Sequence, residues 1–201
     1  MSYLGDNTTF KLLNEDLRHH IKDFDCGNDD LNEFFREDSI KYSEQLLGKT
    51  YCFHLDNDES KMVALFTVSN DSIKTQHLPN SRAKSVKKKI PREKQSSSFP
   101  SVLIGRLGLH KEFHGVVNNE KSIGDEVMDF IKAWFVDPSN KTGCRFIVVD
   151  AYNQEKVINY YSRNGFKMLF SSEEQEGEYF EREEVRTRLM MFDLITLNPT
   201  E

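Results

Sequence analysis

The segment from Asp150 to Phe166, read as DAYNQEKVINYYSRNGF, restricts the possible folds more than any other part of the chain. Val157, Ile158 and Tyr161 recur at helical spacing, so they share one face of a short helix. Gly165 is expected to end this helix, because glycine readily adopts the positive φ found at many helix C-termini. The segment therefore predicts a strand end, a polar turn, a helix and a second apolar strand.

The length and composition predict one soluble domain. A chain of 201 residues can bury a substantial core, and we expect a single domain over residues 1–201. The hydrophobic content of 37% and the charged content of 30% are ordinary for a globular protein. No run of about 18 apolar residues is present, so no membrane span is expected. The N-terminal residues also lack the pattern of a secretory signal.

The cysteines and histidines predict neither disulfides nor a metal site. Cys26, Cys52 and Cys144 are odd in number and far apart, which favours buried thiols in a reducing, cytoplasmic compartment. His110 and His114 are four residues apart, but their stretch reads as strand and loop rather than helix, so we expect no zinc.

The net charge of -6 is unevenly distributed along the chain. Residues 70–100 hold eight basic and only two acidic side chains, whereas seven glutamates gather between residues 173 and 184. A basic block on an acidic protein predicts one local anionic partner. A solvated loop is the alternative for the basic block, and the glutamates are predicted to form a solvated hairpin tip.

The order of the expected elements mixes antiparallel strands with helical crossovers, which predicts an α/β or α+β fold with a mixed sheet. Asn28 is the expected N-cap of a helix that runs to about Gln45, and a further helix is expected from about Gly124. Residues 70–100 are expected to be an extended insertion with one or two basic helical turns. The expected strands are Thr8–Leu13, Thr50–Leu55, Met62–Val68, Ser101–His110, Arg145–Val149, Phe166–Phe170 and Leu189–Leu197.

The segment RLGLHKEFHGVVNNEKSIG, residues 106–124, has the features of an anion-binding loop. A strand ends, a glycine-containing loop exposes backbone N–H groups, and a helix N-terminus directs its dipole to the same place. A pyrophosphate could bind there without a basic side chain. The alternative is an ordinary connection between a strand and a helix. Gly105 and Gly108 lie within the strand itself, which predicts a bulge or the close approach of a ligand.

Taken in order, these motifs resemble those of the GNAT family of N-acetyltransferases. The resemblance covers roughly residues 24–194. It rests on the Tyr four residues before Gly165-Phe166, on Leu107-Gly108-Leu109, and on the loop that starts at His114-Gly115 and ends at Ser122-Ile123-Gly124. It implies a mixed, mainly antiparallel sheet flanked by helices, here with a basic insertion at about 70–100. About five extra residues, drawn from 116–121, and His114 in place of Arg or Gln depart from the family pattern.

The resemblance also implies a reaction and a set of site residues. Acetyl-CoA would donate its acetyl group to a primary amine by direct attack. Tyr161 would protonate the leaving thiolate, and the backbone N–H near Leu109 would stabilise the oxyanion. Glu112 and Asp150 are the candidates for a general base. The residues implied in cofactor binding are Leu107, Gly108, Leu109, His114, Gly115, Ser122, Ile123, Gly124 and Asn153. The alternative for Tyr160 and Tyr161 is amphipathic packing.

The N-terminal half resembles more narrowly the GNAT subgroup that includes tRNA-acetylating toxins of toxin–antitoxin pairs. The matching residues are Phe24-Asp25-Cys26-Gly27, Leu31 to Phe35, Lys49-Thr50-Tyr51 and Ala64 to Ser69. The implied partners are an amine substrate, tRNA bound through the basic residues 82–94, an antitoxin and a second copy of the chain. A non-catalytic acyl-CoA-binding module is the alternative from another class, and thioester cleavage would distinguish the two.

Overall fold

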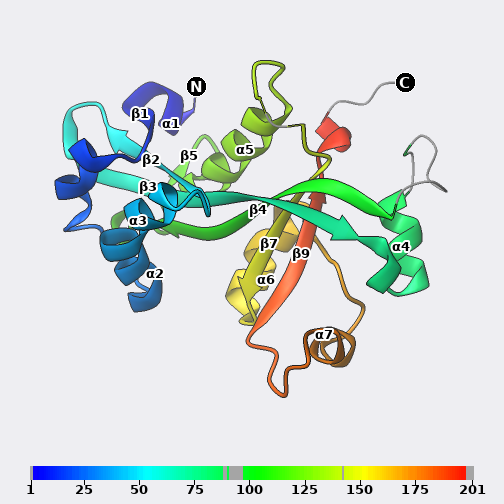
Figure 1. The fold of residues 1–201 in the computed structure, drawn as a ribbon. Helices are drawn as coiled ribbons and strands as arrows, with labels where there is room; N and C mark the ends of the chain where they lie inside the picture. Colours follow the sequence, from blue (N-terminus) through cyan, green and yellow to red (C-terminus); the bar gives the residue numbers. More distant parts are fainter. Residues whose placement is uncertain (1, 88–89, 91–96, 142, 198–201) are drawn as a thin grey trace. The chain divides into compact units, whose positions relative to one another are not determined.

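The computed structural model describes residues 2–87, 90, 97–141 and 143–197. Its main sheet has seven strands in the order β1-β2-β3-β4-β7-β9-β8 (Figure 1), and every pairing with a recorded register is antiparallel. The strands of this sheet are β1 Thr8–Leu12, β2 Lys49–Leu55, β3 Asp58–Lys74, β4 Ser98–Leu109, β7 Phe146–Tyr152, β8 Lys167–Met168 and β9 Thr187–Asp193. The described helices are α1 Tyr3–Asn7, α2 Asp29–Glu33, α3 Ser39–Glu44, α4 Asn80–Lys87, α5 Ile123–Val136, α6 Glu155–Arg163 and α7 Glu173–Phe180.

The contacts divide the chain into two units. Unit 1 comprises Met1–Ser69 and Ile104–Ile131, and unit 2 comprises Asn70–Leu103 and Lys132–Glu201. Strands β3 and β4 each run from one unit into the other. A single GNAT-like domain over residues 1–201 stays a prediction. None of the described helices is long and apolar enough to cross a membrane.

Unit 1 is built around aromatic and sulfur-containing side chains. Phe24 and Phe35 meet edge to face at 5.7 Å and pack with the fully buried Cys52. The helix predicted from Asn28 begins there, because the Asn28 side chain accepts the N–H of Leu31. It continues through a π-helical stretch, Phe34–Asp38, into α3. The predicted N-cap is therefore confirmed.

Unit 2 has its own hydrophobic cluster on one face of its strands. Phe146, Val148 and Met191 from β7 and β9 pack with Val86 of α4 and Phe180 of α7. The insertion predicted over residues 70–100 is more regular than expected, because β3 extends to Lys74 and β4 begins at Ser98. Helix α4 supplies the predicted basic helical turns. The residues at these two strand ends adopt strand structure because they pair within the sheet. Local sequence does not reveal such pairing.

The acidic stretch after β8 forms a helix rather than the predicted hairpin tip. Ser172 caps α7 by accepting the N–H of Gln175, and Glu176 is only 2% exposed. The Glu176 carboxylate accepts hydrogen bonds from Arg188 Nε at 2.7 Å and from the Leu189 N–H at 2.6 Å. The prediction of a solvated hairpin tip was wrong because Arg188, which binds Glu176, lies 12 residues away on β9.

Candidate functional site

The glycines of β4 have different surroundings in unit 1. A Cβ atom added to Gly108 would lie 3.1 Å from Phe35 Cε2 and 3.2 Å from Cys26 Cβ. The packing of Phe35 and Cys26 against the strand therefore explains this glycine without a ligand. A Cβ atom on Gly105 would meet nothing within 4 Å. Leu107 and Leu109, on either side of Gly108, are both half-buried.

The two histidines that follow β4 organise the chain locally. His110 is 8% exposed, its Nδ1 accepts the N–H of Glu112 at 3.3 Å, and burial lowers its pKa. The His114 ring is exposed, and its Nε2 lies 2.8 Å from the carbonyl oxygen of Leu109. The described residues contain no group of three or more potential metal ligands. His114 thus ties the start of the anion-binding loop to the end of β4.

The extra residues of this loop form a small β-hairpin, the two-stranded sheet of β5 (Val117–Asn118) and β6 (Lys121–Ser122). Asn119 and Glu120 turn the chain with φ values of 47° and 69°, the signature of a tight type I′ turn. The residues that flank this hairpin are joined by a backbone hydrogen bond. The Ile123 N–H donates to the Val116 carbonyl at 3.1 Å, just beyond the hairpin.

Gly115 offers a backbone donor for an anion within this loop. Gly115 has a φ of 73°, and a Cβ atom there would meet nothing within 4 Å. Its N–H has no hydrogen-bond acceptor among the residues that the structure describes. By contrast, Ser122 Oγ accepts the N–H of Asp125 at 3.1 Å and so caps α5 itself. Gly124 follows directly, half-buried in the first turn of α5. The loop therefore fits an anionic group at Gly115.

Sequence reasoning missed Glu126, which fastens this region together. Its carboxylate is 7% exposed and accepts hydrogen bonds from Ser2 Oγ at 2.7 Å, from the N–H groups of Tyr3 and Leu4 at 3.1 and 3.0 Å, and from Asn118 Nδ2 at 3.2 Å. Burial would raise the pKa of Glu126, but these hydrogen bonds outweigh it and hold the pKa below its usual value. An acidic residue in a first helical turn was the available signal.

Tyr161, the predicted general acid, lies on α6 in unit 2. It is 8% exposed, and its ring contacts Tyr160 at 5.1 Å and Phe166 at 5.4 Å. No hydrogen bond to its hydroxyl is found within the described part of the chain. Burial raises the pKa of Tyr161, so the phenol keeps its proton at neutral pH. Tyr161 therefore packs within unit 2 and also keeps the proton that a general acid must donate.

Asn153 and the two candidate bases have contrasting environments. Asn153 Nδ2 donates to the Val185 carbonyl at 2.9 Å, which fastens the end of β7 to the segment before β9. Glu112 is paired with Lys61 in unit 1, and the bond from that ammonium lowers the pKa of Glu112. Asp150 is exposed in unit 2, and its side chain has no partner among the described residues. Of the two candidate bases, Asp150 is therefore the one whose carboxylate is not paired with another described residue.

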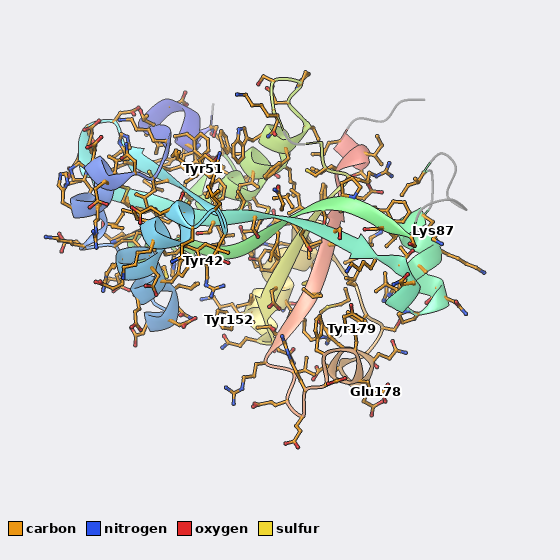
Figure 2. All side chains as sticks on the ribbon, in the orientation of Figure 1. Tyr42, Tyr51, Lys87, Tyr152, Glu178 and Tyr179 are labelled. Carbon is orange, nitrogen blue, oxygen red and sulfur yellow. The ribbon has the colours of Figure 1, made fainter. Side chains whose placement is uncertain are left out.

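The basic segment is described only in part. Arg82, Lys84 and Lys87 lie on α4, and Figure 2 labels Lys87 at the end of this helix. Lys84 is exposed, whereas Arg82 and Lys87 are partly buried. The remaining predicted contacts with an anionic partner, Lys88, Lys89, Arg92 and Lys94, lie outside the described residues.

Comparisons with known proteins identify the fold. No protein-family model matches the chain, and no curated protein matches it. Solved structures do. The structure of AtaT complexed with acetyl-methionyl-tRNAfMet has a TM-score of 0.66 and 21% identity, over 95% of this chain and 97% of that one. A tyrosine-to-phenylalanine mutant of KacT also has a TM-score of 0.66 and 21% identity, over 96% and 98% of the two chains.

A third structure is that of a mutant AtaT toxin bound to the C-terminus of the antitoxin AtaR and to acetyl-CoA. It has a TM-score of 0.60 and 16% identity, over 96% of this chain and 99% of that one. At these identities the likeness shows the fold. The predicted GNAT-like fold, a mainly antiparallel sheet flanked by helices, is therefore confirmed.

Proposed function

We propose that this protein is an acetyl-CoA-dependent N-acetyltransferase whose acceptor is the primary amine of an aminoacyl-tRNA. The fold it shares with AtaT and KacT extends over nearly the whole of each chain, which supports this proposal. AtaT was determined with an acetylated methionyl-tRNA, and separately with acetyl-CoA and an antitoxin segment. By the same argument, the protein is the toxin of a toxin–antitoxin pair and forms one GNAT-like domain.

The observation that carries the catalytic proposal is the buried position of Tyr161 on α6, four residues before Gly165. The neutral amine attacks the thioester carbonyl, the carbon–sulfur bond breaks, and the Tyr161 hydroxyl gives its proton to the departing thiolate. The amine loses its proton to solvent and the phenolate regains one. The backbone N–H near Leu109 stabilises the negative charge on the carbonyl oxygen.

The cofactor would be held by the end of β4 and by the hairpin loop. Leu107, Gly108 and Leu109 would pair with pantetheine through their backbone groups, as a peptide strand pairs with a sheet edge. The Gly115 N–H supports a pyrophosphate contact at the loop, and Ser122, Ile123 and Gly124 form the helix N-terminus beside it. His114 would position the loop through Leu109, and Asn153 would position the turn after β7.

We place the protein in the cytoplasm, where charged tRNA is found. The three cysteines are free thiols, which supports this location. The implied antitoxin and a second copy of this chain are the remaining proposed partners.

Two measurements test the function. Acetyl-CoA at about a hundred times its Kd should stabilise the fold by about 2.7 kcal/mol, visible as a rise in Tm. Tyr161→Phe should lower the rate of acetyl transfer to aminoacyl-tRNA by roughly 10²–10⁴-fold, because only the proton donor is lost. Tyr160→Phe is the matched control, since its ring lies under Arg163 and it should keep the parental rate. A non-catalytic acyl-CoA-binding module would show the rise in Tm but cleave no thioester.

A further inference from the structure

Unit 2 contains a groove of about 380 Å³ on the sheet face that also carries its hydrophobic cluster. Its floor is apolar and comes from four strands and the region of α7. Ile73, Val148 and Phe170 are buried members of this floor. Tyr179, labelled in Figure 2, lines the groove from α7 and contacts the Phe170 ring at 5.2 Å. Small-molecule sites in proteins begin at about 300 Å³, so the groove fits one small apolar group.

The rim of the groove is charged. Asp71 on β3 and Asp150 on β7 are both exposed, and neither side chain has an ion pair or hydrogen bond among the described residues. Lys74 and Arg182 also line the groove, and the Arg182 guanidinium lies 4.7 Å from the centre of the Phe180 ring. The rim therefore offers anionic and cationic groups around an apolar floor. This combination suits a ligand that carries an apolar group together with a positive and a negative charge.

Asp150 is an unusual residue for its position. It interrupts β7, whose other residues from Phe146 to Ala151 are all buried. In the register with β9 it lies opposite Leu189, and Leu189 also lines the groove. Because alternate residues share a strand face, Asp150 lies beside Val148 at the edge of the apolar floor. A carboxylate there can bind an ammonium whose substituent occupies the floor.

The opposite face of the same strands carries Tyr161. Its ring contacts Phe166, which contacts Phe192 at 5.5 Å. Phe192 pairs with Ile147, the neighbour of Val148, so the Tyr161 cluster and the groove lie on opposite faces of β7 and β9. The groove is therefore separate from the packing cluster around Tyr161.

We propose that this groove binds the aminoacyl end of the acceptor, with an apolar side chain on the floor and the α-ammonium at Asp150. Lys74 and Arg182 would face the phosphate of the nucleotide to which the amino acid is esterified. This inference rests on the proposed acetyltransferase function and adds selectivity for apolar amino acids. The bound ammonium first releases one proton to solvent, and the neutral amine then attacks the thioester. The amide product carries no charge, so it loses its contact with Asp150 and is released more readily.

The test compares one tRNA charged in turn with leucine, methionine, glycine or aspartate, so that only the aminoacyl group differs. Burying an apolar side chain should raise kcat/KM for leucine and methionine about 10–100-fold above glycine. Asp150→Asn should raise KM for every acceptor about 10-fold and leave KM for acetyl-CoA unchanged. Leu189→Trp, a change at a partly buried residue that lines the groove opposite Asp150, should fill the groove and abolish the preference for leucine.

Glu183→Gln is the matched control, because it removes an exposed carboxylate of unit 2 that does not line the groove. It should keep both the rate and the preference. Melting curves of all variants exclude misfolding. Equal rates for leucine and glycine, or unchanged kinetics in both groove variants, would overturn the inference while leaving acetyl transfer intact. No transfer to any charged tRNA would also overturn it, and no rise in Tm with acetyl-CoA would remove the proposed function as well.

Discussion

Glu126 joins three segments that are distant in the sequence. From α5, its carboxylate accepts hydrogen bonds from the start of α1 and from the hairpin, although only 7% of the residue is exposed. Two of these donors are backbone N–H groups, which have few alternatives once buried. The position of the hairpin, and with it the proposed pyrophosphate contact at Gly115, therefore depends on one side chain.

Glu126→Ala should lower the free energy of unfolding by about 2–4 kcal/mol, because buried donors lose their acceptor. The pKa of this carboxyl is lowered in the fold, so its contribution is complete at neutral pH and disappears as the pH falls below about 4.3. Urea denaturation of the parent and of Glu126→Ala at several pH values checks this. Asp129→Ala, which removes an exposed carboxylate paired with Lys121, should change stability by under about 1 kcal/mol. Equal losses in both variants would contradict the assignment.

Residues whose role is local were predictable from the sequence. Asn28 caps its helix through the Leu31 N–H, and Gly165 has the φ of 81° expected after a helix. Gly108 was also singled out, but Phe35 and Cys26 account for it, and both lie far away in the sequence. Asp150 was noticed only as a candidate base. Its place at the groove depends on β9 and α7, which no local pattern predicts.

Among the elements, α7 shows what sequence reasoning overlooked. Seven glutamates suggested a solvated tip, yet Ser172 followed three residues later by Gln175 matches a capping box. One bond of the motif forms, since Gln175 donates its N–H to Ser172 Oγ. The Gln175 side chain accepts the N–H of Ser171, the residue before the cap, instead of that of Ser172. The hydrogen bond that anchors α7 could not be predicted, because its donor, Arg188, lies on β9. A helix start could therefore be predicted, but not its anchor.

Two substitutions separate the anchor of α7 from its surface charge. Glu176→Ala leaves the buried Arg188 guanidinium without its close partner at 2.7 Å, and should cost about 3–5 kcal/mol of unfolding free energy. Glu173→Ala removes an exposed partner of the same arginine at 3.4 Å and should cost under about 1 kcal/mol. Guanidinium denaturation of both variants measures the difference. A similar cost for the two would show that α7 is held by its apolar residues instead.

At the scale of the whole molecule, the order of the elements predicted a mixed sheet with helical crossovers, and the GNAT-like fold was implied by the resemblance of the motifs taken in order. The apolar periodicity located most strands, although β3 and β4 are longer than predicted. The extra residues 69–74 and 98–100 lie next to a polar segment with two prolines, which concealed these strand ends. The extra residues of the anion-binding loop could be counted but not given a shape, because the Asn119-Glu120 turn is not among the usual glycine-containing pairs.

The uneven charge of the molecule bears on how an acidic protein would bind tRNA. The net charge is -6, yet residues 70–100 carry about +6, so any attraction to RNA must be local. Each phosphate neutralised by this segment should add about 0.7–0.9 to the slope of log affinity against log salt. A solvated loop would add nothing to it.

Replacing Lys87, Lys88 and Lys89 together by Ala should therefore flatten the salt dependence of tRNA binding and leave acetyl-CoA binding unchanged. Filter binding or fluorescence anisotropy from low to moderate salt measures the slope, and a melting curve with acetyl-CoA verifies the fold. Lys11→Ala is the matched control, because it removes a lysine of unit 1 that is already paired with Glu59. If the triple variant keeps the parental slope, these three lysines do not contact RNA phosphates, and tRNA must bind through other basic residues, such as Lys74 and Arg182 at the rim of the groove.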